Sequence, residues 1–138
     1  MSFISEWCVP KRVVYIRYGE DVTIEDFQGV AKAMTTYIEE GDPPLVHNIV
    51  DYTDVKQMPT SVFKGAKALS HLGNPKYGWA IIIDAGNPLV KMRTSIMAQG
   101  NNNRFRSFET LQEGIEFLQY VDSTLEDVAW DFPEAQPE

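Results

Sequence analysis

The sequence has 138 residues, enough for one domain with its own hydrophobic core, and its 43% hydrophobic and 23% charged residues are typical of a globular protein. The net charge of −8 argues against a nucleic-acid-binding protein, which needs a basic surface against the phosphates. The single cysteine, Cys8, excludes an intrachain disulfide, and no apolar run reaches the roughly 18 residues of a membrane-spanning helix. No secretion signal opens the sequence, so we expect a cytoplasmic protein.

The negative charge is concentrated after Val121, where six acidic residues occur without a lysine or arginine. Residues 122–138 are therefore predicted to be an acidic C-terminal tail on a domain formed by residues 1–121. One interpretation is a frayed, solubilising end. The other is a segment that docks on its own domain or on a partner, because Trp130 and Phe132 are unusual in a disordered tail.

The first third of the chain predicts two strands and a helix. FISEWC, residues 3–8, and VVYIRY, residues 13–18, are separated by a turn and indicate a β-hairpin. Thr23 is a good helix cap, with its hydroxyl placed to accept from the backbone N–H of Asp26. Gly41 and the two prolines that follow end this helix. Its apolar residues recur at helical spacing: Ile24, Phe27, Val30, Ala31, Met34 and Ile38.

The middle of the chain predicts a buried strand followed by a second helix. LVHNIVDY, residues 45–52, is nearly continuous in apolar character, as in a strand covered on both faces. The helix is expected to run from Thr60 or Ser61 to Leu72, where Gly73, Asn74 and Pro75 break it.

The last part of the chain predicts two more strand–helix units. GWAIIID, residues 78–84, reads as a buried strand, and Asn87 followed by Pro88 is a helix start. RFRSF, residues 104–108, alternates as an edge strand does, and TLQE, residues 110–113, is a capping-box pattern. The apolar positions of the two helices are Leu89, Met92, Ile96 and Met97 in the first, and Leu111, Ile115, Leu118 and Val121 in the second.

The predicted element order is ββαβαβαβα. Strands that alternate with helices pair in parallel through right-handed crossovers, whereas the opening hairpin is antiparallel. The sequence therefore predicts an α/β fold with a mixed, mainly parallel five-stranded sheet and about four helices.

Four stretches in this order resemble the STAS domains, and among these the SpoIIAA-like group of bacterial proteins: DVTIEDFQ, LVHNIVDYTDV, GNPKYGWAIIID with NPLVKM, and RFRSFETLQEGIEFL. The resemblance spans residues 3–121. It implies a regulatory binding module related to anti-sigma-factor antagonists, in which a partner kinase phosphorylates a serine at the start of the second helix.

Counting from Asp51, which ends the third strand, the resemblance places Thr60 at the phosphoacceptor position and Ser61 at the second serine. Pro59 and Val62 replace the flanking acid and glycine of the family motif. The residues themselves also allow a simpler interpretation, because hydroxyls at a helix start usually cap the helix. The predicted partner site is thus Asp51, Thr60 and Ser61, and its partner is an anti-sigma-factor-like kinase.

An alternative function follows from the third predicted helix. The resemblance implies a lipophilic ligand beneath a movable helix, and the apolar residues Leu89, Met92, Ile96 and Met97 suit such a pocket as well as an ordinary core. Four nearby cations form either an ordinary solvated face, which could pair with the acidic tail, or a contact with an anionic membrane surface or acidic partner: Lys91, Arg93, Arg104 and Arg106. We therefore hold open a carrier or sensor of a lipophilic molecule that associates peripherally with membranes.

The sequence favours no enzymatic activity, cofactor or metal site. No nucleotide-binding glycine motif, catalytic cysteine pattern or metal-ligand spacing is present. Asp51 and Asp84 both end strands, and two carboxylates at one sheet edge are the single hint of a catalytic pair. The sequence leaves the oligomeric state open, and a dimer is compatible with it.

Overall fold

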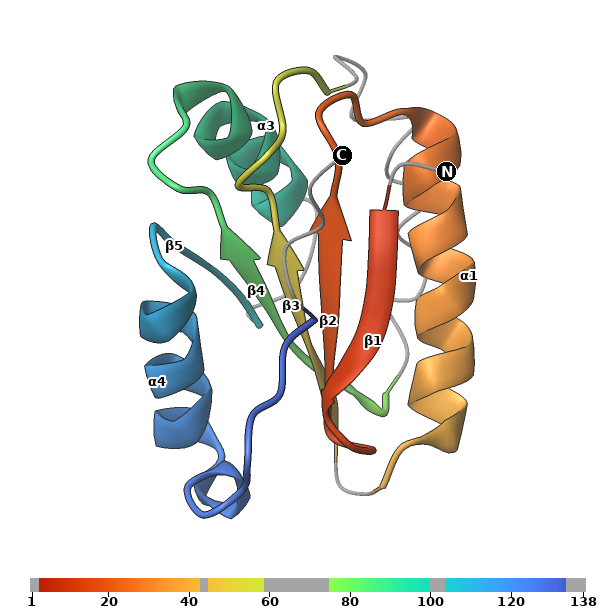
Figure 1. Ribbon diagram of the computed structural model, residues 1–138, viewed down its shortest axis with the longest axis vertical. Helices are drawn as coiled ribbons and strands as arrows, with labels where there is room; N and C mark the ends of the chain where they lie inside the picture. The colour runs from red at the N-terminus through yellow and green to blue at the C-terminus, as the bar shows by residue number, and fades with distance from the viewer. Residues whose placement is uncertain (1–2, 43–44, 59–74, 100–103, 134–138) are drawn as a thin grey trace.

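The computed structural model describes residues 3–42, 45–58, 75–99 and 104–133, with the backbone alone for residues 94–99 (Figure 1). Their elements follow the predicted order and confirm the α/β class. The predicted helix over residues 60–72 lies outside the described residues. The elements are β1 (Phe3–Val9), β2 (Val13–Tyr18), α1 (Ile24–Glu40), β3 (Val46–Asp51), β4 (Tyr77–Ile83), α3 (Pro88–Gln99), β5 (Phe105–Phe108), α4 (Leu111–Val121) and a 3₁₀ turn (Ser123–Leu125).

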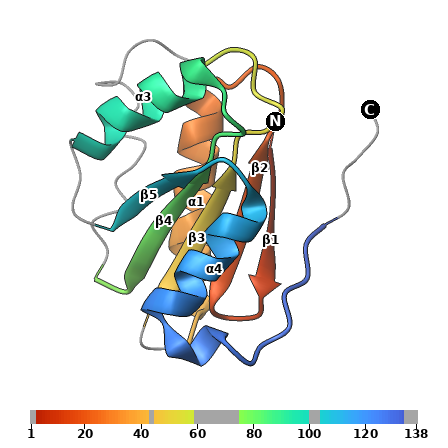
Figure 2. The same cartoon turned by 90° about the vertical axis from the view of Figure 1, so that its left-hand side faces the viewer.

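The five strands form one sheet in the order β1-β2-β3-β4-β5. The first pair is antiparallel and the other three pairs are parallel, which confirms the predicted mixed sheet. Figure 2 shows α4 in front of the sheet and α1 behind it. The carboxyl ends of the parallel strands therefore meet at one edge, the upper edge in Figure 1.

Local sequence signals fix the starts of α1 and α4. Thr23 and Asp26 form a reciprocal capping box at the start of α1, and Thr110 and Glu113 do the same for α4. Each box satisfies two of the backbone N–H groups that a helix start leaves without partners.

The sheet separates two hydrophobic cores. Alternate residues of a strand point to opposite faces, so Val50 and Ile82 belong to the α1 side while Ile49 and Ile81 belong to the α4 side. Helix α4 packs on β4 and β5. On the same face of the sheet, β1 and β2 are therefore left for another segment to cover.

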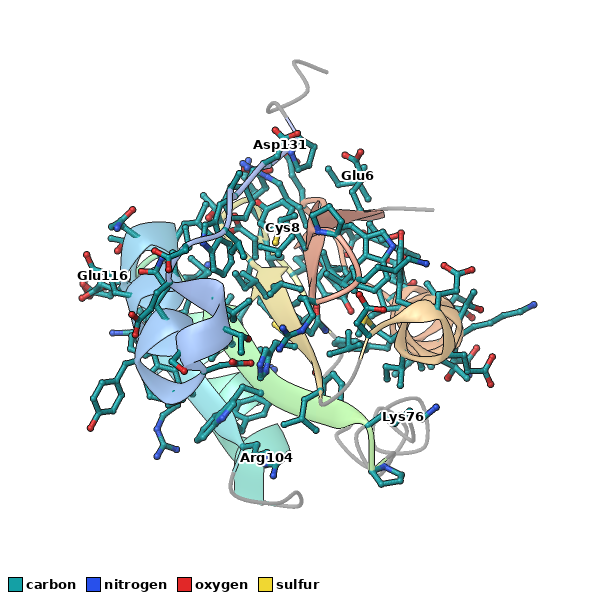
Figure 3. All side chains as sticks on the ribbon, turned by 90° about the horizontal axis from the view of Figure 1, so that it is seen from below. Glu6, Cys8, Lys76, Arg104, Glu116 and Asp131 are labelled. Atoms are coloured by element: carbon teal, nitrogen blue, oxygen red, sulfur yellow. The ribbon has the colours of Figure 1, made fainter. Side chains whose placement is uncertain are left out.

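That segment is the chain after α4. Leu125 is fully buried, and Val128, Trp130 and Phe132 pack against the same core as Cys8 and Ile49. The backbone N–H of Asp131 donates to the carbonyl of Cys8 at 2.9 Å, and Figure 3 shows the two labelled residues near each other. The tail that the sequence marks as acidic is thus docked on its own domain as far as Phe132.

Candidate functional site

The carboxyl edge of the sheet brings together the loop after β3 and the turn after β4. The side-chain amide of Asn87 donates to the carbonyl of Val55 at 3.0 Å and joins these two segments. The loop is also held to the chain before α1, because the carbonyl of Glu20 accepts from Lys56 and Gln57 at 2.7 and 3.0 Å. Ligand sites of open α/β sheets form at such edges.

Asp51 is buried at this edge, with 4% of its surface exposed. The Tyr15 hydroxyl donates to one carboxylate oxygen at 2.5 Å, and the backbone N–H and hydroxyl of Thr53 donate to the other. The Arg17 guanidinium lies 3.9 Å away. Burial, followed by the bond and charge of Asp51, raises the pKa of Tyr15 well above its ordinary value. Asp51 is thus a structural anchor for the loop that leads toward Thr60 and Ser61, which both lie outside the described residues.

Asp84 is equally buried, at 3% exposure, but its contacts differ from those of Asp51. The backbone N–H of Gly86 donates to Asp84 Oδ1 at 2.8 Å, and Ala85 and Gly86 both have positive φ, at 54° and 75°. Asp51 bonds to Tyr15 on the α4 side of the sheet, whereas Asp84 lines a cleft with Lys91 of α3. The two buried carboxylates thus have separate hydrogen-bond partners, and a catalytic pair stays a prediction.

The cleft beyond β4 and β5 has a volume of about 420 Å³. Among the described residues it is lined by Asp84, Lys91, Ser107, Phe108 and Glu109. Sequence reasoning placed Asp84 at a strand end and missed Ser107 and Glu109. Their positions in the sequence could have indicated them, because residues that end or follow neighbouring parallel strands meet at the same edge of the sheet.

The four predicted surface cations lie on different sides of the sheet. Lys91 is on α3 and lies 3.9 Å from Glu109, and Arg93 is on the same helix. Arg104 donates to the carbonyl of Tyr77 at the opposite end of β5. The guanidinium carbon of Arg106 lies 5.2 Å from the centre of the Trp79 ring and 5.8 Å from that of Phe117, against α4. The structure therefore groups Lys91 with Arg93 and separates both from Arg104 and Arg106.

The apolar residues of α3 differ in how deeply they are buried. Val90 is fully buried, Leu89 is partly buried, and Met92 is 50% exposed. The side chains of Ile96 and Met97 lie outside the described part of the structure. The lipophilic-ligand site therefore stays a prediction.

A buried histidine connects the amino end of β3 to the tail. His47 Nδ1 accepts from the backbone N–H of Trp79, and Nε2 lies 2.9 Å from Asp122 Oδ2. Asp122 also forms an ion pair with Arg12 at 2.8 Å and accepts from Thr124. Sequence spacing shows no partner for His47 because Asp122 is 75 residues away.

These contacts shift the pKa values of both partners downward. Burial lowers the pKa of His47, and the hydrogen bond and charge of Asp122 offset only part of that effect. Burial acts to raise the pKa of Asp122, but the bonds from Thr124 and His47 and the Arg12 charge lower it overall. The arrangement is a neutral imidazole that donates to a carboxylate.

Cys8 and the acidic residues provide no nucleophile or metal centre in the described ranges. Burial raises the pKa of the Cys8 thiol to about 12, so little thiolate forms at neutral pH. No group of three or more histidine, cysteine, aspartate or glutamate side chains in the described part of the chain is placed to hold a metal ion. None of the described helices is long and apolar enough to cross a membrane.

Three solved structures share this architecture. A DUF3478-family protein with a SpoIIAA-like fold from Shewanella loihica PV-4 is 14% identical, with a TM-score of 0.61, covering 85% of this chain and 92% of its own. The phosphorylated form of the Bacillus cell fate determinant SpoIIAA is 20% identical, with a TM-score of 0.52, covering 85% of this chain and 99% of its own. The unphosphorylated form of the anti-sigma factor antagonist SpoIIAA is 20% identical, with a TM-score of 0.54, covering 86% and 98%.

These likenesses confirm the predicted SpoIIAA-like fold. No family model matches the sequence, and the curated proteins contain no match to it. At these identities the shared feature is the fold, so function has to be argued from the residues of this chain.

Proposed function

We propose that this chain is a non-enzymatic regulatory module that binds a protein partner through the carboxyl edge of β3. The observation that carries the proposal is the anchoring of Asp51, immediately before the segment that contains Thr60 and Ser61. Support also comes from a protein of the same fold that is described as an anti-sigma factor antagonist. The expected partner is an anti-sigma-factor-like kinase.

The loop over residues 52–58 is suited to present a fixed surface to such a partner. Its backbone is bonded to Glu20 and Val22, and Asn87 holds it from the other side. Asp54 is half exposed and paired with Arg17, while Lys56 is 73% exposed at its side chain. A loop held in one conformation loses less entropy on binding than a mobile one does.

The hydroxyls of Thr60 and Ser61 have two proposed roles at this edge. As helix caps they would stabilise the start of the predicted second helix by about 1 kcal/mol. As phosphoacceptors they would add negative charge at the docking surface and change partner affinity. SpoIIAA is known in phosphorylated and unphosphorylated forms, which motivates testing the second role here.

The test combines a purified anti-sigma-factor kinase, ATP and this chain. Native mass spectrometry would detect a complex, and intact mass with peptide mapping would detect phosphate on Thr60 or Ser61. We expect Lys56→Glu to weaken the complex and Lys32→Glu, an exposed position on α1, to leave it unchanged. A complex that both variants weaken equally would contradict docking at this edge, and the absence of any complex would remove the proposal.

A second candidate function is the peripheral lipid carrier, which one observation favours. Met92 is a large apolar side chain with half of its surface exposed on α3, beside Lys91 and Arg93. Flotation with vesicles containing anionic lipid would test it, with Met92→Gln as the variant and Ile4→Gln, an exposed apolar position on β1, as the control. Equal recovery of both variants and the unmodified protein with the vesicles would contradict a role for α3.

A further inference from the structure

The cleft at the ends of β4 and β5 has the volume of a small-molecule site and is lined mostly by polar side chains. Its volume of about 420 Å³ lies at the lower end of the range for such sites, roughly 300–1,000 Å³. Asp84 comes from the turn after β4, Lys91 from α3, and Ser107, Phe108 and Glu109 from the end of β5. Elements from three parts of the chain therefore converge on one polar opening.

The carboxylate of Asp84 is the least exposed charged group of this cleft. Within the described ranges, its one hydrogen-bond donor is the backbone N–H of Gly86, at 2.8 Å from Oδ1. A carboxylate removed from water is costly unless donors or a positive charge compensate it. Asp84 Oδ2 thus provides acceptor capacity toward the cleft that the turn itself does not use.

A second carboxylate lies close to the same turn. A Cβ atom placed on Gly86 would be 3.6 Å from Glu109 Oε2, so Glu109 reaches over the turn that Asp84 begins. Lys91 pairs with Glu109 at 3.9 Å, and both side chains are at least half exposed. The two carboxylates outnumber the single lysine, so the cleft favours a ligand that brings positive charge.

The chemistry of the lining favours an organic cation over a metal ion. Two carboxylates and the Ser107 hydroxyl supply at most five oxygens, so water would have to complete the six to eight oxygen ligands of Ca²⁺. No group of at least three acidic, cysteine or histidine side chains in the described part of the chain converges for a metal. Phe108 adds apolar surface that suits the carbon chain of an organic ligand.

We propose that this cleft binds a small organic molecule through a primary ammonium group that donates to the Asp84 carboxylate. The carbon chain of the ligand lies along Phe108, and Ser107 and Glu109 provide further acceptors near the opening. The Lys91–Glu109 pair frames the entrance. This proposal does not depend on the protein partner proposed above, because no residue of the cleft belongs to the loop over residues 52–58.

The test uses four small probes and the full chain. NMR titrations would follow backbone amides with 1,4-diaminobutane and butylamine, which carry the ammonium, and with butan-1-ol and butyrate, which do not. We expect saturable shifts that centre on residues 84–91 and 107–109 for the two amines alone. Shifts spread over all acidic surfaces, or equal binding of butan-1-ol, would overturn the proposal in favour of unspecific association.

Two variants distinguish binding at the Asp84 carboxylate from unspecific attraction to acidic side chains. Asp84→Asn keeps an oxygen for the Gly86 N–H. Its loss of charge should weaken amine binding by about tenfold or more, because charge-assisted hydrogen bonds are about twice as strong as neutral ones. Glu20→Gln, an exposed acid at the same edge, should leave the affinity unchanged.

Two replacement variants test the site if Asp84→Asn does not fold. If the amide spectrum shows that Asp84→Asn does not fold, Glu109→Gln and Ser107→Ala at exposed positions take its place, and each should weaken butylamine binding severalfold. Unchanged affinity in folded Asp84→Asn, or in both replacement variants, would refute the site while leaving the partner-binding proposal untouched.

Discussion

The imidazole of His47 accepts a hydrogen bond from the backbone N–H of Trp79 at 2.9 Å. An acceptor nitrogen carries no proton, so the hydrogen of this neutral ring lies on Nε2 and donates to Asp122. The register explains why the Trp79 N–H is available: Val46 faces Tyr77 and Asn48 faces Ala80, so β4 has two residues opposite His47. Such a β-bulge leaves a residue outside the regular strand pairing.

The first prediction concerns Gly78 in this bulge. A Cβ at Gly78 would lie 2.3 Å from His47 Nδ1, so Gly78→Ala has to displace the ring and should lower the free energy of unfolding by about 1–3 kcal/mol. In a His47→Ala background the ring is absent, and the same glycine substitution should cost much less. Urea unfolding of the four proteins measures this coupling. Additive effects would mean that Gly78 and His47 act independently.

The second prediction is a loss of stability in mild acid. The folded chain holds His47 with a pKa below its ordinary value of 6.5, chiefly because of burial. Between the folded and unfolded pKa values the unfolded chain binds a proton that the folded chain does not, so the free energy of unfolding falls as the pH drops below about 6.5. For one proton the slope cannot exceed about 1.4 kcal/mol per pH unit.

The charged groups that face His47 support this direction. Asp122 favours the protonated ring, whereas Arg12 and Arg104 oppose it, and a proton on Nδ1 would also face the Trp79 N–H. Unfolding curves between pH 7.5 and 5.0 would measure the slope, with His47→Gln as the control that should flatten it. The same slope in both proteins would assign the acid sensitivity to other groups.

The sequence predicts well what depends on neighbouring residues. The caps at Thr23 and Thr110 are confirmed because their partners lie three residues away, and the parallel strands follow from alternation with helices. It predicts poorly what depends on long-range contacts. The pairing of His47 with Asp122 and the meeting of Asp84 with Glu109 require the register of strands that only the folded sheet defines.

The position of the tail was also difficult to predict from the sequence. Composition alone favours a frayed acidic end, whereas the apolar residues Leu125, Trp130 and Phe132 pack on a part of the core that α4 leaves uncovered. The aromatic residues of the tail indicated docking. The surface on which they dock could not be predicted, because it depends on where α4 lies on the sheet.

The third prediction tests the docked tail through Leu125. This side chain is fully buried, so Leu125→Ala should cost about 2–5 kcal/mol, whereas Asp127→Ala at an exposed neighbouring position should cost little. Release of the tail should also expose the buried Cys8 thiol. Reaction with 4,4′-dithiodipyridine should therefore be faster in Leu125→Ala than in Asp127→Ala. Equal thiol reactivity and stability in the two variants would contradict the packing of the tail on β1.

The fourth prediction concerns Tyr15, which connects the docked tail to the candidate partner site. Its ring contacts Phe132 edge-on with centroids 5.2 Å apart, and its hydroxyl donates to Asp51. Tyr15→Phe retains the ring contact and removes the hydroxyl, so any effect reports on the contacts of the hydroxyl with Asp51 and Arg17. We expect a loss of about 1.5–3 kcal/mol, because the acceptor is a buried charged group.

Tyr37→Phe is the matched control, because the Tyr37 hydroxyl donates to the carbonyl of Ser5 at 3.2 Å and its loss should cost about 0.5–1.5 kcal/mol. Hydrogen exchange should distinguish the two variants further. The Thr53 amide, which donates to Asp51, should exchange faster in Tyr15→Phe than in Tyr37→Phe if the hydroxyl holds Asp51 in place. Equal losses of stability and equal Thr53 exchange would show that Asp51 positions the loop through Thr53 and Arg17 without help from Tyr15.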